Sequence, residues 1–404
     1  MNTQTLKHFL AMLIPKLAFR NILGAGLRTW LNVVVLSIAF VAIIWIQGMI
    51  EGMNNQAMTA LIDSEYGGGQ FWHRAYDPYD PFTLDEAHAL LSPALKEFVR
   101  TGQATPILAT SGAIFPQGRI QSAQLRGINP DQRILNIPTD VLKTDNPDII
   151  PALIGSRMAE QTRLQIGDDV TVRWRDVHGT FDAADIRIVQ IMSTTVQSID
   201  SGQIWLPLEH LRNMLAAPDE ATLVVLAKPP EVVPADNETW VYRDLTYLLN
   251  NIIQLIKSKS IGSLIMYVLL MGMALLAIFD TQVLAVFRRR REMGTLMALG
   301  MPRSQIIGLF TLEGALHGAL ALALGAMYGI PLLSYSAANG IAMPAEMMDS
   351  MGFAIADTLY PSYGMKLVLG TTVIVLITVT IVSFLPTRRI AKLKPTDALR
   401  GKVA

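Results

Sequence analysis

The stretch LNVVVLSIAFVAIIWIQGMI, residues 31–50, decides the fold of this chain. It contains no charged residue, and it is long enough to cross a hydrocarbon core, which takes about 20 residues of helix. Three more apolar stretches follow at 261–287, 306–333 and 367–386. We therefore predict an integral membrane protein with four transmembrane α-helices. The long segment between the first two stretches predicts one large domain of mixed α+β structure.

The charges predict the orientation of the spans. The net charge is zero, but basic residues gather in the short segments beside the spans. They are Lys7, Lys16, Arg20 and Arg28 before the first span, Arg288, Arg289, Arg290, Arg291 and Arg303 after the second, and Arg388, Arg389, Lys392, Lys394, Arg400 and Lys402 after the fourth. Basic short loops remain on the cytoplasmic side. We expect both termini inside and the large domain outside.

Helix signals on both sides of the large domain predict two stalks. The first apolar helix continues toward Asp63 and is broken by Gly67-Gly-Gly69, and helical spacing resumes at Asp244. The alternative is two separate elements with flexible joints. The expected division is an amphipathic cytoplasmic helix at 1–29, spans at 30–52, 259–287, 304–333 and 363–386, the outer domain with its stalks at 53–258, a cytoplasmic helix at 288–303, an outer loop at 334–362 and a cytoplasmic tail at 387–404.

Local patterns predict the elements of the outer domain. We expect strands at 70–75, 105–115, 170–174, 186–191, 203–206 and 221–227, and helices at 84–99, 156–164 and 208–215. A hairpin turn is expected near His178-Gly179, because glycine after a polar residue favours a tight turn between two strands.

Catalytic motifs are absent from the sequence. It has no GxxxxGK[ST] phosphate loop, no HExxH motif and no cysteine, and its six histidines are dispersed. We expect a chain that is not an enzyme, with no catalytic residue, no metal site and no cofactor of its own.

Residues 288–302, RRRREMGTLMALGMP, predict a short amphipathic helix between the second and third spans. Met293, Leu296 and Met297 form its apolar face, and a glycine followed by a proline ends it. We interpret it as a docking helix for a cytoplasmic partner; the alternative is an ordinary basic loop. Its candidate residues are Arg288, Arg291, Glu292, Met293, Gly294, Leu296, Met297 and Gly300.

The third span carries a row of small residues and two ionisable ones. Small residues allow helices to approach closely in lipid, and the candidate packing residues are Gly314, Gly318, Gly325 and Gly329. Glu313 and Asp280 of the second span are expected at similar depth, with His317 one turn away. Hydrogen bonding between helices and a proton relay are the two interpretations.

Methionines predict a candidate substrate cavity near the outer half of the first two spans. These are Met49, Met53, Met266 and Met271, whose flexible thioethers suit an adaptable apolar site. Ordinary packing is the alternative.

Three segments resemble the FtsX-like permeases of MacB-type ABC transporters. REMGTLMALGMPRSQI at 291–306 resembles the family's signature after the second span, and PTRRIAKLKPTDALR at 386–400 resembles its terminal motif. Leu17-Ala-Phe-Arg-Asn-Ile-Leu23 with Leu27-Arg-Thr29 matches its entry into the first span. In the outer domain, Gly68-Gly-Gln-Phe-Trp-His73, Leu125-Arg-Gly-Ile-Asn-Pro130 and the segment 154–170 resemble the lipoprotein-releasing LolC and LolE branch.

The resemblance implies a MacB-like periplasmic core as the outer domain and a bacterial inner membrane as the location. It also implies that a separate dimeric ABC ATPase uses ATP and Mg²⁺, with 288–300 as the coupling helix. Other implied partners are a second permease copy or paralogue, membrane lipids, and a periplasmic chaperone, adaptor or lipoprotein substrate. No nucleic acid is expected.

Two departures from the family pattern stand out. The segment 173–187 is shorter than the proline-bearing hook with which LolC recruits a chaperone, and Asp280 stands where MacB permeases carry asparagine.

The expected function is ATP-driven release of lipoproteins by mechanical transmission. The alternatives are a MacB-like efflux permease for peptides or drugs, and an FtsX-like regulator of a periplasmic hydrolase.

Overall fold

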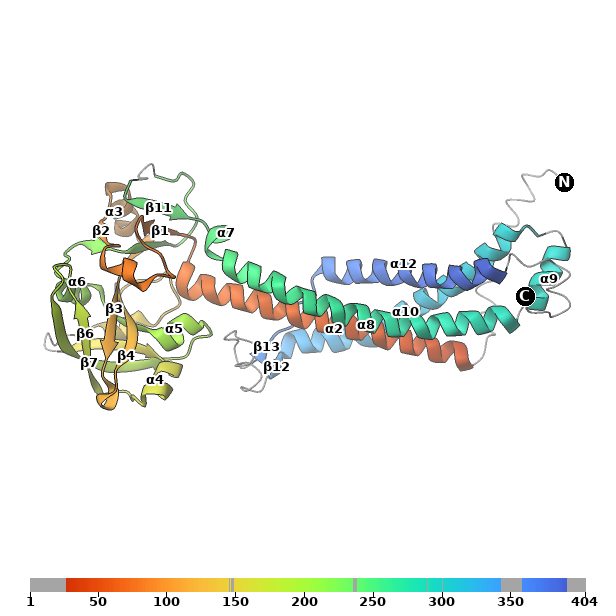
Figure 1. Ribbon diagram of the computed structural model, residues 1–404, viewed down its shortest axis with the longest axis horizontal. Coiled ribbons are helices and arrows are strands. Elements are labelled where there is room, and N and C mark those ends of the chain that lie inside the picture. The colour runs from red at the N-terminus through yellow and green to blue at the C-terminus, as the bar shows by residue number, and fades with distance from the viewer. Residues whose placement is uncertain are drawn as a thin grey trace. The chain divides into compact units, whose positions relative to one another are not determined.

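The structure is a computed structural model that describes residues 27–144, 146, 149–234, 238–288, 290–299, 301–342 and 358–390. The chain divides into two compact units (Figure 1). The helical unit comprises Met1–Met53, Lys257–Ile341 and Leu359–Ala404, and the sheet unit comprises Asn54–Ile256 and Ala342–Thr358. The predicted amphipathic helix at 1–29 lies outside the described residues except for its end, and so does the predicted tail beyond residue 390.

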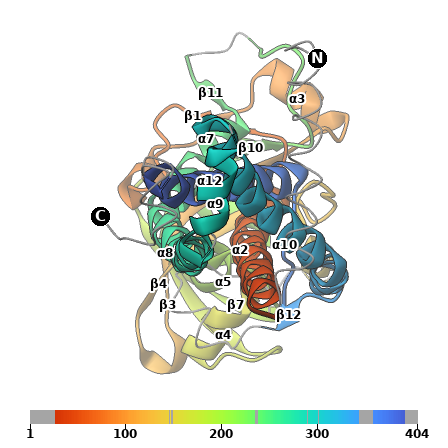
Figure 2. The same ribbon diagram turned by 90° about the vertical axis from the view of Figure 1, so that its right-hand side faces the viewer.

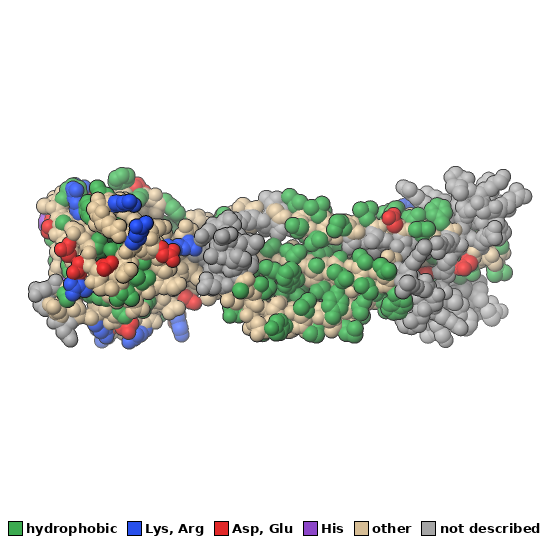
Figure 3. All heavy atoms as spheres, turned by 90° about the horizontal axis from the view of Figure 1, so that it is seen from below, with side chains coloured by type: hydrophobic (Ala, Val, Ile, Leu, Met, Phe, Trp, Pro, Cys, Tyr) green, Lys and Arg blue, Asp and Glu red, His purple; other side chains and the backbone are tan. Residues whose placement is uncertain are grey.

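Long helices form the helical unit, and Figure 2 shows them nearly end-on. In the described residues they are α2 (Leu27–Leu61), α8 (Asn250–Arg288), α10 (Arg303–Asn339) and α12 (Met365–Ile390), with the short α9 (Arg290–Ala298) between α8 and α10. Their shared core includes Phe40, Met271, Ala321 and Val379. Apolar side chains also cover the outside of these helices (Figure 3).

Three of the four predicted spans are supported. Among the described residues, the helices long and apolar enough to cross a membrane are Trp30–Tyr66, Arg303–Asn339 and Met365–Arg388. The helix α8 has 39 residues, but its described apolar segment is Leu264–Met273. The span at 259–287 therefore stays a prediction.

The sheet unit is built on one large sheet. Within the described residues the strand order is β11-β1-β10-β3-β4-β8-β5-β7-β6, and β3 also pairs with β6. The strands are β1 (Gln70–His73), β3 (Ala104–Ile114), β4 (Gln121–Ile128), β5 (Ile150–Gly155), β6 (Asp169–Arg175), β7 (Phe181–Met192), β8 (Gln203–Pro207), β10 (Leu223–Leu226) and β11 (Trp240–Arg243). The extra pairing joins β3, β4, β8, β5, β7 and β6 into a closed ring, which leaves these strands no open edge.

Shorter elements complete the two units. The helices are α3 (Pro93–Arg100), α4 (Ser156–Thr162), α5 (Gln197–Gly202), α6 (Leu208–Leu215) and α7 (Leu245–Leu248), and the short strands are β2 (Ala89–Leu90), β9 (Glu220–Ala221), β12 (Ile341–Ala342) and β13 (Thr358–Leu359). The strand β2 pairs with β9, and β12 pairs with β13.

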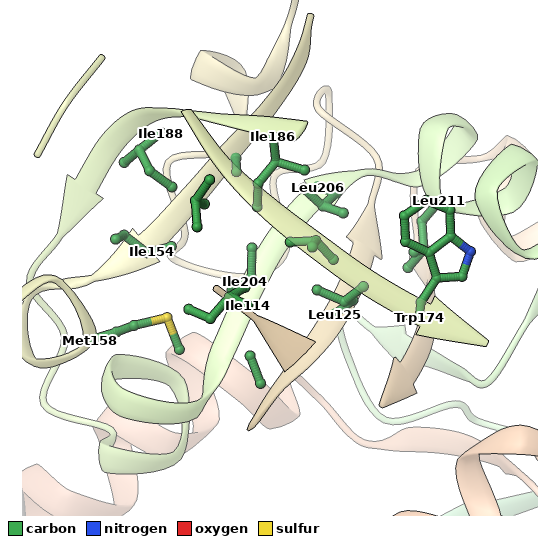
Figure 4. Close-up of a cluster of buried hydrophobic side chains, with 14 of the residues drawn as sticks. Ile114, Leu125, Ile154, Met158, Trp174, Ile186, Ile188, Ile204, Leu206 and Leu211 are labelled. Atoms are coloured by element: carbon green, nitrogen blue, oxygen red, sulfur yellow. The ribbon is translucent and has the colours of Figure 1, made fainter. Parts of the chain in front are cut away.

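The ring is filled by apolar side chains that point inward from its strands (Figure 4). Along β6 buried and exposed residues alternate, as one face of a strand requires. Leu125, Ile154 and Ile204 are fully buried. Trp174 lies among them, and its indole Nε1 donates to the backbone oxygen of Met214 at 2.7 Å. This core stabilises the unit, because burial of apolar surface dominates folding. Two further buried clusters, around Trp205 and around Trp240, lie in the same unit.

The helices that border the sheet unit end and begin at specific residues. A π-helical turn, Ile62–Tyr66, follows α2, and Gly67 with φ of 56° stops it, its N–H donating to the oxygen of Ile62 at 2.7 Å. This confirms that the glycine run breaks the helix. At the other border, the carboxylate of Asp244 accepts from the N–H of Tyr247 at 2.8 Å and caps α7.

Several predicted elements are confirmed and one is wrong. The helices at 156–164 and 208–215 and the hairpin near His178 are present as α4, α6 and the β6–β7 pair. The single helix predicted at 84–99 is wrong. That segment contains the end of the 3₁₀ turn Pro81–Asp85, then β2, then α3. The Ser92 hydroxyl accepts from the N–H of Leu95, and Pro93 occupies the first helical position, so a new helix begins there.

Candidate functional site

The predicted coupling segment forms a helix of its own, α9, which ends at Ala298. Beyond it, the N–H of Met301 donates to the oxygen of Leu296 at 2.9 Å, and Pro302 is the N-cap of α10. The side chains of Arg288, Arg291 and Met293, and the residue Gly300, lie outside what the structure describes. The docking role of α9 stays a prediction.

The apolar face of α9 packs inward. Leu296 and Met297 lie against a small core formed by Ile306, Leu309 and Phe310 of α10. The buried Gly294 lies on the same helix. Two of the residues predicted to meet a partner therefore hold α9 on its neighbour.

The other face of α9 is exposed. Of its residues, Glu292 was predicted from the sequence, whereas Thr295, Ala298 and Leu299 were missed. This face presents Glu292, Thr295 and Ala298, followed by Leu299, whose side chain is 80% exposed. The signal was present in the spacing of three to four residues from Glu292 to Leu299, which places them on one helical face. A large apolar side chain is thus left on the surface beside the end of α9.

The four glycines of α10 predicted to pack lie on its buried face, whereas Gly308 near its start is exposed. A Cβ added to Gly318 would lie 3.2 Å from Val379 Cγ1 of α12. Further along, a Cβ on Gly325 would lie 3.2 Å from Phe40 Cδ1 of α2, and one on Gly329 would lie 2.8 Å from Val41 Cγ2. The fourth glycine, Gly314, is also buried. One row of small residues thus sets the approach of two different helices.

The ionisable residues predicted in the spans have different surroundings. Glu313 and His317 are buried on α10, and His317 Nδ1 donates to the backbone oxygen of Glu313 at 2.6 Å. Asp280 is exposed on α8. The structure places Glu313 and His317 one helical turn apart and leaves Asp280 outside that pair. Neither the relay nor the interhelical bond is tested by this arrangement.

The four methionines of the predicted cavity differ in how deeply they are buried. Met271 is buried in the core of the helical unit, Met266 is 51% exposed, and Met49 and Met53 are half-buried. A shared substrate cavity at these residues stays a prediction.

The β6–β7 hairpin closes with a compact loop. The Asp176 carboxylate accepts from the N–H groups of His178 at 2.9 Å and Thr180 at 2.7 Å, and Gly179 has a φ of 84°. Backbone N–H groups of the loop thus find their hydrogen-bond acceptor within the loop itself. Among the described residues, therefore, no hook projects from this hairpin.

Comparison with known families covers most of the chain. The profile of the MacB-like periplasmic core domain matches residues 29–238, and that of the FtsX-like permease C-terminal matches residues 264–395. The chain belongs to the FtsX-like permeases with a MacB-like periplasmic core. It is therefore a permease of the MacB/LolC type of ABC transporter. Membership implies a partner ATPase and the inner membrane, and permease subunits of this family are typically non-catalytic.

The comparisons also return individual proteins. The permease is 22% identical over 326 residues to the lipoprotein-releasing system transmembrane protein LolC of Neisseria meningitidis serogroup B, covering 74% of this chain and 77% of the relative. It also matches the periplasmic region of MacB from Actinobacillus actinomycetemcomitans at 12% identity and a TM-score of 0.31, covering 46% of this chain and 92% of that one. The extracellular domain of the noncanonic ABC-type transporter YknZ from Gram-positive bacteria matches at 12% identity and a TM-score of 0.26, covering 40% and 84%.

Proposed function

We propose that this permease releases lipoproteins from a bacterial inner membrane. The observation that carries the proposal is the similarity to LolC, which extends over 74% of this chain and 77% of the relative. A match that covers 74% of this chain must reach into both family segments, 29–238 and 264–395, rather than one shared module. In this proposal both termini are cytoplasmic and the sheet unit is periplasmic.

In this proposal, another protein hydrolyses the ATP. A separate ATPase dimer binds ATP and Mg²⁺, and this chain holds no cofactor. The exposed face of α9 receives the ATPase, with Leu299 as its apolar anchor. Since Leu296 and Met297 pack on α10, a push on α9 passes directly into that helix. The long helices α2 and α8 then act as stalks toward the sheet unit.

A second permease would complete the membrane part. Several apolar side chains of α8 are more than half exposed, including Leu264, Val268 and Leu269. In a membrane such a surface is covered by lipid or by another helix. A second copy or a paralogue beside α8 fits the proposal.

The test reconstitutes the purified complex, with its ATPase, in proteoliposomes that contain a triacylated lipoprotein. ATP should transfer the lipoprotein to the soluble fraction. Leu299→Asp should strongly reduce release per ATP, because it places a charge at the anchor. Val232→Asp is the matched control, since Val232 is 79% exposed in the sheet unit. Retention of the lipoprotein with ATP hydrolysis intact would contradict release.

The match of the MacB-like periplasmic core favours efflux as the second candidate. The same proteoliposomes distinguish the two functions. Retention of lipoprotein, together with ATP-dependent movement of a peptide or drug to an added periplasmic adaptor, would replace release by efflux.

A further inference from the structure

A pocket of about 790 Å³ lies inside the sheet unit, where the turn after α2, strand β1 and the start of α7 and α8 meet. None of the candidate site residues predicted from the sequence lines it, although Gln70, Trp72 and Arg126 belong to segments that resemble the LolC and LolE branch. Its walls combine aromatic rings, arginines, amides and two carboxylates: Tyr66, Trp72, Tyr76, Tyr79, Tyr247, Arg74, Arg126, Arg243, Gln70, Gln203, Asn251, Glu65 and Asp77. The volume lies within the range of about 300–1,000 Å³ that small-molecule sites occupy.

The aromatic wall is held in place by hydrogen bonds and ring contacts. The indole of Trp72 donates to Gln70 Oε1 at 2.6 Å, and Gln70 Nε2 donates to the backbone oxygen of Glu65 at 2.6 Å. Trp72 meets Tyr76 edge to face at 5.1 Å and Tyr247 at 5.9 Å. Asn251 also bonds the hydroxyl of Tyr79. The wall is therefore ordered before any ligand arrives, which lowers the entropy lost on binding.

The two inner arginines differ in their partners. Arg126 lies 3.6 Å from the carboxylate of Glu65, and its Nε donates to Gln124. Arg243 instead lies over two rings, 4.2 Å from the centroid of Tyr247 and 5.6 Å from that of Trp72. Its Nε is buried without a hydrogen-bond partner among the described residues. The guanidinium thus packs against two neighbouring rings, and one of its donors has no hydrogen-bond partner in the described part of the chain.

A second polar atom in this pocket also has no partner. Gln203 is 3% exposed, and its Oε1 has no hydrogen-bond partner in the described part of the chain. Buried polar groups without partners are rare in native proteins, and a ligand is one of the explanations for them. Because Oε1 is an acceptor, it can pair with a donor on a ligand but not with the ligand's anionic group. Burial raises the pKa of Tyr76 and of Tyr79, two of the phenols that line the pocket.

We propose that this pocket binds an amphipathic organic anion. Its acidic group pairs with Arg243, and its apolar body lies against Trp72, Tyr76 and Tyr247. Guanidinium groups favour carboxylate and phosphate oxygens, and aromatic walls favour a flat apolar body. The site is independent of lipoprotein release, since it needs no contact with the lipoprotein.

The test uses the full chain in phosphatidylcholine nanodiscs with 6-fluoro-2-naphthoate as the probe, followed by ¹⁹F NMR against empty nanodiscs. The probe should bind the wild type, and Arg243→Gln should weaken binding by about tenfold or more, because the charge-assisted bond is lost. Arg243→Lys should recover part of the loss. Arg119→Gln is the matched control, since Arg119 is exposed and does not line the pocket.

Three outcomes would overturn the proposal. They are equal binding by the wild type and Arg243→Gln, equal binding of the neutral alcohol 6-fluoro-2-naphthalenemethanol, and full displacement of the probe by inorganic phosphate at a comparable concentration. Tyr247→Ala gives a second variant in case Arg243→Gln unfolds. It should weaken the naphthoate while the thermal transition of the chain is unchanged.

Discussion

The sheet unit and the helical unit bury their apolar residues in opposite ways. The closed ring turns Leu125, Ile154 and Ile204 to its interior, where they are fully buried. The helices leave large apolar side chains outside: Leu264 of α8 is 58% exposed and Ile377 of α12 is 54% exposed. The ring buries its large apolar side chains within itself, whereas the helices need lipid or another chain to cover theirs.

The largest expected effect is in the ring. Ile204→Ala should destabilise the sheet unit by about 2–5 kcal/mol, because the removed methyl groups leave a cavity in a fully buried site. Hydrogen exchange of the strand amides in the full chain measures this locally. Ile120→Ala, at a side chain 74% exposed, is the control and should change little. Similar exchange rates in both variants would refute the claim that the ring core stabilises the sheet unit.

A smaller effect is expected where α10 meets α2. Gly329→Val should destabilise the helical unit by about 1–3 kcal/mol, because extra carbon atoms overpack a close helix contact. Gly308→Val, on the same helix with open space around its Cβ, is the control. The measurement is the temperature at which half the protein stays monodisperse in detergent, and it should be lower for Gly329→Val than for Gly308→Val. If both variants behave alike, Gly329 does not set the approach of α2.

The smallest effect is expected at an exposed ion pair of the ring. Arg187 donates twice to the Asp169 carboxylate at 2.7 Å, and these hydrogen bonds hold the pKa of Asp169 below its usual range. The folded state therefore favours the ionised form of Asp169, and the pair stabilises the fold fully at pH values above the unfolded pKa of about 3.9. This stabilisation is lost as the pH falls through the lower pKa of the folded state.

Arg187→Gln should therefore lower the thermal midpoint slightly at neutral pH and not at all in acid below both values. Arg119→Gln should leave the midpoint unchanged at either pH. A loss in Arg187→Gln that persists in acid would show that packing, rather than charge, holds this pair.

Hydropathy predicted the helices well because each long apolar stretch specifies its own local structure. Strands β4 and β5 were missed for physical reasons. The sequence of β4 has few large apolar residues, and β5 contains Pro151. Both strands are stabilised by neighbours far along the chain, so local periodicity carries little of their signal.

The candidate sites show the same limit. The helix α9 was predictable from its residues, but its orientation depends on Ile306 and Phe310 in the next helix. The aromatic pocket was not predictable, because β1 and β11 become neighbours only through the order of the strands. Sequence reasoning finds sites within one segment more easily than sites assembled from several.

The pairing of β1 with β11 limits how the two strands can move relative to each other. β1 follows the turn after α2, β11 precedes α7 and α8, and the strands are in register from Gln70 opposite Arg243 to His73 opposite Trp240. An antiparallel ladder repeats every two residues, so a slide between the strands regains its bonds only after about 7 Å. A small displacement of β1 must therefore be shared by β11, and any slip between the two strands would occur as a single discrete jump.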